Sequence, residues 1–520
     1  GVDNDAVNQG WMCDKGRYNF EYLNSDSRLK TPLKMMEDEL VEIEIQDVYS
    51  ELTEFIKDRQ TKVNFLLGSN LTNEDYVAFR EFSKTISQSE RSFYLNDDLL
   101  YKGFFGENIE LAKIDDLNSS DAIVVWAEDL KEKLPVLYLR IRQAVKNGVK
   151  LVVFGHTNET LSDIADVFYG KDMVSENFEI LKDLSKMKEI NNLVVGKNIT
   201  AILGKSTPYQ SDESVTKLFE FLNSNANSKV LNAYSKGNTY GAFQTLENLK
   251  GLNDFVNDIS KDNTDLLFIV GADPIGRSVY SNQIKSIIKS INTVVTLDNF
   301  NHETSELSDY VVPISSTLGE KEGTFTNIEF RTSRIDKLVP SPGQTLSDWE
   351  FITSLMNFAG LTVESNSLED LNRKAYENLD SSLSPVFDNL DKPSNLDGMI
   401  NISKPKISSS ENKLSKTMFF TGEKLYGDSA TERHSDSISM LGSKKFIEVS
   451  ESVVEKYNLT SGSCTLTQDE VEVTVSYKVN NNFPNDLVYI PTNRRELNKF
   501  DFSREIMIIP SQVKEALNVN

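Results

Sequence analysis

The chain has 520 residues, of which 39% are hydrophobic and 9% aromatic, so it can bury several cores and we expect roughly three or four domains. Its formal net charge of -24 argues against nucleic acid and anionic lipid as direct partners, because both require clustered Lys and Arg. The chain has only two cysteines, which excludes a disulfide framework. Its three histidines are scattered, which argues against a self-contained zinc or haem site. It has no long apolar run and no signal-like N-terminus, so we expect no membrane insertion.

The first α/β unit is expected at residues 51–198, after a polar N-terminal strap at residues 1–50. Its expected strands are short apolar runs at 63–67, 122–126 and 151–154, and its expected helices lie at 48–59, 73–87 and 135–147. Strands and helices that alternate at this spacing predict right-handed βαβ units and a parallel sheet.

The same alternation predicts a second doubly wound unit at residues 199–374. Its expected strands lie at 199–203, 230–233, 266–270, 294–297 and 310–312, and its expected helices at 212–224, 242–258 and 281–291. We therefore expect two parallel-sheet domains in succession.

The C-terminal part begins with an expected linker at residues 375–415, which is rich in Ser, Asn, Asp, Lys and Pro. At 416–520 the apolar residues alternate with a period of two, and the turns contain Gly and Asn. This pattern predicts a small β-barrel with one helix at 451–457.

The stretch 297–331 is where we expect a binding crevice, because a strand ends at Pro313 and opens into a polar loop at 319–327. Four carboxylates in it are candidate acid–base groups: Glu303, Glu306, Glu320 and Glu322. No nucleophile accompanies them, and the alternative in so acidic a chain is that these carboxylates lie in solvated loops.

Three turns contain glycine, at 68–70, 204–206 and 271–273. Each could bind a phosphate through its backbone N–H groups, or could contain glycine only because the turn requires its backbone freedom.

Cys13 lies in the strap and could be a reactive thiol, a metal ligand or an inert side chain. An iron–sulfur cluster takes four thiolates, and the chain has only one other cysteine. That residue, Cys464, lies in an alternating pattern and is expected in a core. The residues alone therefore assign no catalytic and no cofactor-binding side chain.

Several segments resemble the molybdopterin oxidoreductase superfamily. They are CDKGRYNFEY at 13–22, RLKTPL at 28–33, LTNEDY at 71–76, the segment 121–148 and GADP at 271–274. The resemblance is sharpest in ETS at 303–305, SDYVVP at 308–313 and EKEGTFTNIEFR at 320–331, which are similar to the family's ETA, ADVVLP and E-x-x-GT-x-x-N-x-E-x-R signature. It implies an α/β fold with two doubly wound parallel-sheet domains and a C-terminal β-barrel.

Within that superfamily the chain is most similar to a branch without molybdenum, the large iron–sulfur subunit of NADH:quinone oxidoreductase, respiratory complex I. Molybdenum enzymes of the family carry a Cys, selenocysteine or Ser ligand soon after the NEDY helix, where this chain reads SFYLNDDLL at 92–100 and offers only Ser92. They tend to have an Asp-Pro-Arg turn where GHTN stands at 155–158. The resemblance thus implies a retained fold without molybdenum chemistry, and we expect no bound molybdopterin.

The same resemblance implies that iron–sulfur clusters belong to segments preceding this chain, a ferredoxin-like domain among them, and that this chain alone holds no cofactor and is not catalytic. Cys13 would be a metal ligand only if upstream cysteines complete a [4Fe–4S] cluster. The implied role is a scaffold for electron transfer, docked to the NADH-binding flavoprotein and quinone-module subunits on the cytoplasmic side of a bacterial inner membrane or the matrix side of a mitochondrial one. The alternative is a formate-dehydrogenase-like molybdopterin enzyme.

An inherited empty crevice would leave several signature residues with packing and hydrogen-bonding roles only. These residues are Glu320, Gly323, Thr324, Asn327 and Arg331. We therefore expect Asn327→Ala to lower thermal stability or assembly rather than a catalytic rate alone.

Overall fold

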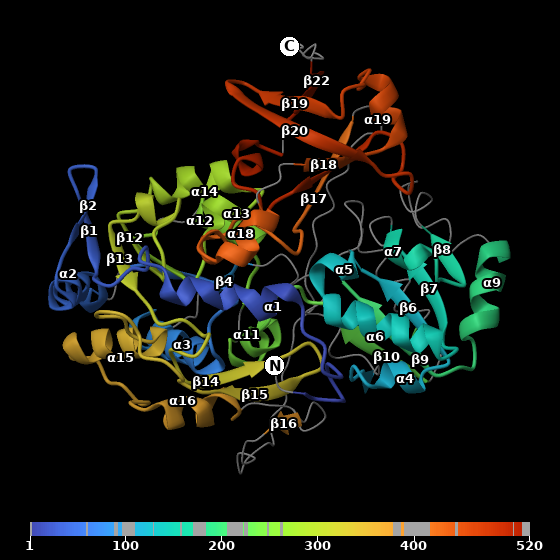
Figure 1. Cartoon of the computed structure of the whole chain (residues 1–520). Helices are drawn as coiled ribbons and strands as arrows, with labels where there is room; N and C mark the ends of the chain where they lie inside the picture. The colour runs from blue at the N-terminus through green and yellow to red at the C-terminus, as the bar shows by residue number, and fades with distance from the viewer. Residues whose placement is uncertain are drawn as a thin grey trace.

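The computed structural model contains two α/β bodies, with a C-terminal sheet placed above them (Figure 1). We call the body built on the seven-stranded sheet the first body and the one built on the six-stranded parallel sheet the second body. The structure describes residues 3–58, 61–87, 92–95, 110–127, 129–155, 159–169, 184–204, 222, 227–246, 249–260, 264–377, 386–388, 417–442, 446–502 and 504–511.

The sheet of the first body has the strand order β2-β1-β13-β12-β11-β3-β4. Its strands are β1 (Leu33–Met36), β2 (Glu39–Glu42), β3 (Val63–Leu67), β4 (Ser92–Tyr94), β11 (Leu266–Val270), β12 (Thr293–Asp298) and β13 (Tyr310–Pro313). The strands from β13 to β4 are parallel, and β1 joins β13 in antiparallel orientation. Every residue of β3 and β11 is buried, as expected for central strands covered on both faces.

The sheet of the second body has the order β5-β10-β9-β6-β7-β8, and all its strand pairs are parallel. Its strands are β5 (Glu110–Leu111), β6 (Ala122–Trp126), β7 (Lys150–Phe154), β8 (Val167–Tyr169), β9 (Ile199–Leu203) and β10 (Ser228–Asn232). Its two faces carry separate apolar cores, one around Trp126 and one around Ile141.

The C-terminal sheet is mixed and has the order β17-β21-β18-β20-β19-β22. Its strands are β17 (Met418–Gly422), β18 (Phe446–Val449), β19 (Ser463–Gln468), β20 (Val471–Val479), β21 (Leu487–Pro491) and β22 (Met507–Pro510). It curls into a half-barrel around its own core. A separate hairpin of β14 (Gly323–Thr326) and β15 (Arg331–Ile335) pairs with β16 (Val386–Asp388).

Helices cover the sheets, and local sequence explains how several of them begin. In α15 the carboxylate of Glu350 accepts a hydrogen bond from the backbone N of Ser347, and α6 has Pro135 in its first turn. The helices of the first body are α2 (Ile45–Lys57), α3 (Asn73–Ser87), α11 (Thr239–Thr245), α12 (Leu252–Ile259), α13 (Pro274–Arg277), α14 (Ser281–Ile288), η4 (Ser305–Leu307), α15 (Asp348–Phe358) and α16 (Leu368–Ala375).

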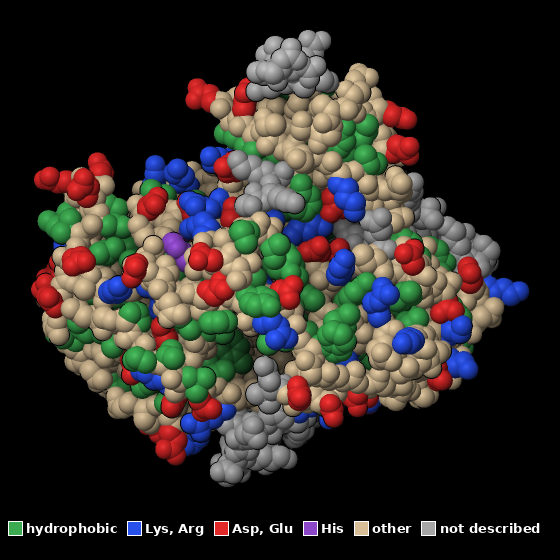
Figure 2. Space-filling view, in the orientation of Figure 1, with side chains coloured by type: hydrophobic (Ala, Val, Ile, Leu, Met, Phe, Trp, Pro, Cys, Tyr) green, Lys and Arg blue, Asp and Glu red, His purple; other side chains and the backbone are tan. Residues whose placement is uncertain are grey.

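The remaining helices belong to the second body, the strap and the C-terminal part. They are α4 (Asp116–Ser119), α5 (Leu130–Lys133), α6 (Pro135–Lys146), α7 (Glu159–Ser162), α9 (Leu184–Val194), α1 (Asp14–Tyr18), η1 (Asn19–Asn24), α17 (Ala430–Arg433), α18 (Asp436–Gly442), α19 (Glu451–Lys456) and η6 (Leu497–Lys499). Acidic and basic side chains are interspersed over the face shown in Figure 2, and apolar side chains gather around α1 and α18. None of the helices described is long and apolar enough to cross a membrane.

The predicted fold class is confirmed, but the sheets do not follow the boundary expected at residue 198. Strands β3 and β4 join β11 to β13 in the first body, whereas β9 and β10 join β6 to β8 in the second. Paired parallel strands are connected by long crossover segments, so strands that are close in the sequence need not belong to the same sheet. Where independently folding domains divide stays a prediction.

Local differences from the predicted elements have simple causes. The strap contains the β1–β2 hairpin, whose turn residues Glu37 and Asp38 have φ of 49° and 70°, a conformation more often signalled by Asn-Gly. The helix expected at 242–258 is two helices, α11 and α12. The helix expected at 212–224 and the linker at 375–415 lie mostly outside the described residues.

Candidate functional site

The candidate site lies at the carboxyl ends of the parallel strands, where open α/β sheets bind ligands. In the first body β3 leads to Gly68, β11 to the turn 271–273 and β12 to Asn299. The loops of the C-terminal part reach these turns, since Asn498 Nδ2 donates to the Gly276 carbonyl at 2.6 Å. The strand ends of the first body and the C-terminal part therefore share one interface.

In the two glycine turns of the first body, the glycine N–H groups bond to the ends of neighbouring strands and are not available to a phosphate. Gly68 N donates to Val270 O, and Gly271 N donates to Leu297 O, both at 2.8 Å. A Cβ added to Gly68 would lie 2.0 Å from Gly271 O. In the third predicted turn Gly204 N donates to Trp126 O at 2.7 Å, and the two residues that follow lie outside the described part of the chain.

A buried histidine joins the turns that follow β11 and β12. His302 Nδ1 lies 3.3 Å from an Asp273 carboxylate oxygen, and His302 Nε2 lies 3.2 Å from one of Asp298. Burial opposes the charge on this imidazole, but the two carboxylates outweigh burial and raise the pKa of His302 to about 10. The imidazole is therefore a cation that links two strand ends.

The four candidate acid–base carboxylates do not meet. Glu306 and Glu322 are exposed, and Glu303 forms an ion pair with Arg495. Glu320 is buried and accepts two hydrogen bonds from Arg28, at 3.0 and 2.7 Å. The predicted solvated-loop alternative holds for the first two, whereas Glu320 anchors the strap.

Buried polar groups of α3 hold the signature loop. Glu74 accepts from Thr324 Oγ1 at 2.7 Å and from Thr324 N at 2.8 Å, and burial raises the pKa of its carboxyl. Lys321 Nζ lies 2.6 Å from an Asp75 oxygen and 2.5 Å from an Asp348 oxygen, with all three side chains at most 1% exposed. The LTNEDY segment and the signature loop thus form one interior network.

The end of the signature ties the two bodies together. Asn327 Oδ1 accepts from Glu329 N at 3.1 Å and from Arg331 N at 2.9 Å, which shapes the turn between β14 and β15. Glu329 Oε1 lies 2.6 Å from Arg331 Nε, and its other oxygen accepts from Ile114 N of the second body at 2.8 Å. The spacing of Asn327, Glu329 and Arg331 in the signature is therefore explained by their structural contacts.

Neither cysteine lies in a turn that follows a parallel strand of the two bodies. Cys13 is half-buried, and its Sγ accepts from Gly16 N at 3.4 Å at the start of α1. Cys464 is buried in β19, and burial raises the pKa of its thiol to about 11. No group of three or more metal-ligating side chains occurs among the described residues. The conditional role of Cys13 as a cluster ligand stays a prediction.

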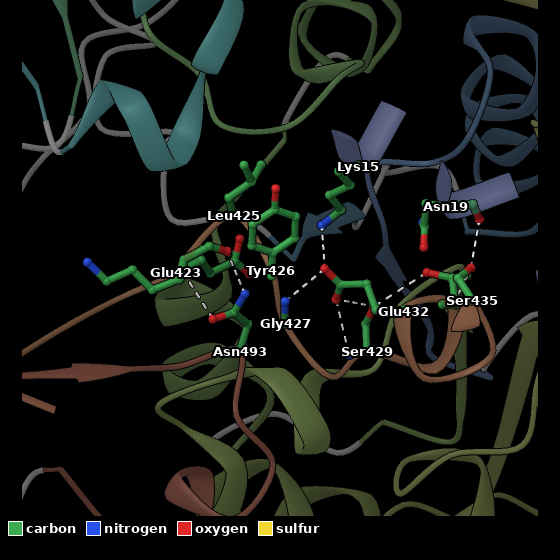
Figure 3. A network of polar contacts seen from close by, with 12 residues as sticks. Lys15, Asn19, Glu423, Leu425, Tyr426, Gly427, Ser429, Glu432, Ser435 and Asn493 are labelled. Carbon is green, nitrogen blue, oxygen red and sulfur yellow. Dashed lines mark hydrogen bonds and ion pairs between the residues drawn. The ribbon is translucent and has the colours of Figure 1, made fainter. Parts of the chain in front are cut away.

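The strap and the C-terminal part are joined by polar contacts that local sequence does not indicate (Figure 3). Lys15 Nζ donates to Glu432 at 2.8 Å, and Glu432 also accepts from Gly427 N and from Ser429. The positive charges of Lys15 and Arg277 hold the pKa of the buried Glu432 carboxyl at about 2, against the opposing effect of burial. This arrangement fixes the strap against the C-terminal part.

The remaining metal candidate, Ser92, begins β4 and does not lie at the carboxyl end of a strand. It pairs with Phe65 in the middle of β3, two residues before the strand ends at Leu67. Its buried Oγ has no hydrogen-bond partner among the described residues. The segment 96–109 and the residues 156–158, where the other departures from molybdenum enzymes fall, lie outside that part of the chain.

A cavity of about 640 Å³ lies between the first body and the C-terminal part. Its lining includes the basic Lys285, Arg433, Arg495 and Lys499 and the acidic Glu303, Asp428 and Glu496, of which Glu303 is paired with Arg495. A cavity of this size with basic groups is suited to a phosphate-bearing ligand of cofactor size. The cavity is therefore suited to the organic part of a molybdopterin group. At the described strand ends, however, no cysteine is present that could bind the metal.

Two open, largely parallel sheets with a covering C-terminal sheet are typical of large α/β proteins that bind ligands at the carboxyl ends of parallel strands. The sequence profile "Molybdopterin oxidoreductase" matches residues 28–358, which is more than half of the chain. The chain belongs to the molybdopterin oxidoreductase family. Because this family is named for its pterin cofactor, the expectation that no molybdopterin is bound is not supported.

Individual relatives are distant. The chain is 22% identical over 453 residues to "F420-dependent formate dehydrogenase subunit alpha" of Methanocaldococcus jannaschii, covering 70% of this chain and 67% of that protein. It is 23% identical to "F420-dependent formate dehydrogenase 2 subunit alpha" of Methanococcus maripaludis, covering 68% and 65%. With an NADH-quinone oxidoreductase subunit of Rhizobium meliloti the identity is 27%, but over only 46% of this chain and 28% of that protein.

The fold is also found in a solved structure, "Acetylene Hydratase from Pelobacter acetylenicus". The TM-score is 0.60 at 11% identity, and the match covers 92% of this chain and 87% of that one. The chain spans about two thirds of the length of the formate dehydrogenase subunits that it matches. The likeness supports the fold, and it does not transfer an activity.

Proposed function

We propose that this chain is part of the large subunit of a molybdopterin-dependent oxidoreductase of the formate dehydrogenase type. The observation that carries the proposal is the cavity of about 640 Å³ beside α13, the helix that follows β11. The similarity to formate dehydrogenase alpha subunits over 68 to 70% of the chain supports it. This similarity extends over more of the chain than the similarity to the NADH-quinone oxidoreductase subunit.

In this proposal the cavity would hold the anionic part of the pterin group. Lys285 on α14 and Lys499 on η6 line it from opposite sides of the interface and would pair with phosphate oxygens. Asp428, with its oxygens 3.1 and 3.2 Å from Arg495 N, would accept N–H groups of a heterocycle. When bound, the group would supply oxidation–reduction chemistry, and the chain's own residues would hold and orient it.

The test is to purify the protein from cells that make molybdopterin and to measure molybdenum, tungsten and the fluorescence of the oxidised pterin. We expect stoichiometric pterin, and we expect Lys285→Met with Lys499→Met to reduce it at unchanged circular dichroism. Lys289→Met is the matched control, because Lys289 follows the same helix, is exposed and does not line the cavity. Protein without pterin and without either metal would overturn the proposal.

A second candidate function is the scaffold role of the large iron–sulfur subunit in NADH:quinone oxidoreductase. The specific observation in its favour is the lack of a thiolate ligand for a metal at the strand ends. The only cysteines of the chain are Cys13 in the strap and Cys464 in the C-terminal sheet. The signature residues are also engaged in interior contacts, as Glu320 with Arg28 and Glu329 with Arg331 show. The match to the Rhizobium meliloti protein supports this candidate over less than half of the chain.

This candidate includes docking to the NADH-binding flavoprotein and quinone-module subunits on the cytoplasmic or matrix side of the membrane, with Cys13 as a conditional cluster ligand. Affinity isolation of the tagged protein from its native membranes distinguishes the two candidates. Recovery of NADH dehydrogenase subunits, with loss of NADH-driven quinone reduction after gene deletion, supports the scaffold. Formate-dependent dye reduction by the isolated complex contradicts it.

A further inference from the structure

Strand β2 (Glu39–Glu42) lies at the edge of the seven-stranded sheet, and one of its two sides is unpaired. Among the residues that the structure describes, β2 pairs only with β1, and Ile43 N, just after β2, donates to Pro32 O at 2.9 Å. Hydrogen-bonding groups of successive residues in a strand point to opposite sides, so the backbone groups of Leu40 and Glu42 point away from β1. No backbone partner of their N–H groups occurs in the described part of the chain. This edge can therefore accept another strand.

The side chains along this edge are apolar and acidic. Met36 pairs with Glu39, and Val41 lies two residues beyond Glu39, so Met36 and Val41 share one face of the hairpin. Their exposed fractions are 51% and 43%. Residues 35–44 contain no Lys or Arg, and the one basic residue of β1, Lys34, pairs with Glu51 of α2. Four exposed carboxylates of the hairpin therefore lack a cation within it: Glu37, Asp38, Glu39 and Glu42.

These charges decide which kind of strand can be added. If a second copy of β2 paired about Leu40 in antiparallel orientation, Asp38 of each copy would stand opposite Glu42 of the other, and like charges in that position are destabilising. Charged side chains commonly protect an exposed edge against such self-association. Charges of a single sign nevertheless attract a segment of the opposite sign. The edge is therefore unfavourable for a second copy of this chain and favourable for a basic segment.

The first body holds this edge in strand conformation. Strand β1 pairs with β13 in antiparallel orientation, with Leu33 opposite Val311. The turn residues Glu37 and Asp38 have φ of 49° and 70°, the geometry of two-residue hairpin turns that match the twist of their strands. The hairpin projects above α2 at the left of Figure 1, and acidic side chains cover its tip in Figure 2. An edge formed in advance lowers the entropy cost of binding.

We propose that β2 is a docking site for an extended segment of a partner protein in which Lys or Arg alternates with apolar residues, and that this segment adds to the sheet as a further strand. The outward backbone groups of Leu40 and Glu42 bond to the backbone of the segment, and the exposed side chains select its sequence. None of the hairpin residues lines the cavity of the proposed function, so the docking site is compatible with either candidate function.

The test uses the full chain and a short, fluorescently labelled peptide of alternating Lys and Val, whose binding is followed by anisotropy. We expect saturable binding, and we expect Glu39→Gln with Glu42→Gln to weaken it about fivefold, because two exposed ion pairs are lost. The matched control is Glu470→Gln with Glu472→Gln, which removes two exposed carboxylates from the hairpin of β19 and β20, where both strands are paired on either side. Since salt screens the change in net charge, this control should weaken binding less than about twofold.

Two further measurements separate strand addition from simple charge attraction. Glu42→Pro removes the outward N–H as well as the charge, and it should bind the peptide about fivefold more weakly than Glu42→Gln, which removes only the charge. Hydrogen exchange at the amides of Leu40 and Glu42 should slow in the unmodified protein when the peptide is bound. If Glu42→Pro disrupts the hairpin, this exchange measurement decides alone.

Three results overturn the proposal. One is absence of saturable binding, and another is equal weakening by the control pair of substitutions. The third is unchanged exchange at Leu40 and Glu42 in the bound protein. Sedimentation of the free protein tests the other occupant, because a dimer that Glu42→Pro dissociates would assign the edge to a second copy and would also overturn the proposal. A monomer with a protected edge in the complex supports it.

Discussion

Lys321→Met is the most informative perturbation of the interior, because Lys321 contacts two buried aspartates at once. Its Nζ lies 2.6 Å from Asp75 and 2.5 Å from Asp348, and all three side chains are at most 1% exposed. Removing one partner from a buried ion pair costs about 3–5 kcal/mol, because the remaining charge stays desolvated. We expect a loss of this size in the free energy of opening of α3 and α15.

The matched control is Lys34→Met. Lys34 also lies 2.6 Å from its carboxylate partner, Glu51, but these side chains are 31% and 41% exposed. A solvent-exposed pair contributes about 0–1 kcal/mol. The difference in stability loss between the two variants therefore reports the effect of burial, because the distance between the ammonium nitrogen and the carboxylate oxygen is nearly the same in both pairs.

Native-state hydrogen exchange is the suitable assay, since it reports opening of individual helices in a protein with several cores. The pH dependence gives an internal check. Burial raises the pKa of Asp348 to about 7, and losing Lys321 raises it further. A raised carboxyl pKa costs stability as pH rises above the unfolded value, so the deficit of the variant should be smaller at pH 5 than at pH 8. Equal losses in Lys321→Met and Lys34→Met would refute the reasoning.

Three further predictions concern the turns. Asn327→Ala removes the acceptor for two backbone N–H groups and should cost about 1–3 kcal/mol in thermal unfolding, whereas Asn327→Asp keeps the acceptor and should cost less. The pKa of His302, raised to about 10, gives stability that is complete below pH 6.5 and is lost as pH rises towards 10; the thermal midpoint of His302→Gln should lack this decline. Gly68→Ala places a Cβ 2.0 Å from Gly271 O and should cost about 1–3 kcal/mol in thermal unfolding, against little change for Gly237→Ala, which has open space.

Apolar periodicity was sufficient to predict the central parallel strands, because a buried parallel strand must be apolar on both faces; the strap hairpin β1–β2 and the hairpin β14–β15, which lies partly in the expected loop 319–327, were not predicted. The expected run at 63–67 is β3, and the run at 266–270 is β11. Periodicity contains no information about which strands pair, so the exchange of β3 and β9 between the expected units could not be predicted. The pairing follows from long-range contacts between the faces of complete sheets.

The candidate site was predictable only where its residues lie near one another in the sequence. The stretch 297–331 was recognisable as a strand end with a polar loop, but the roles of its carboxylates depend on distant partners. Glu320 meets Arg28, and nothing in either local sequence indicates this pairing. The ion pairs of Lys236 and Arg277 with Glu423 have no sequence signal at all, because each residue stands in an ordinary polar segment.

The interior contacts of the signature bear on how fold and activity are related in this family. Thr324 bonds to Glu74, and Glu329 bonds to the second body through Ile114 N. These residues would be needed to join α3, the hairpin and the second body whether or not a cofactor is bound. Loss of stability on their replacement therefore does not distinguish an enzyme from a scaffold. The distinction has to come from whether the cavity of about 640 Å³ binds a pterin group.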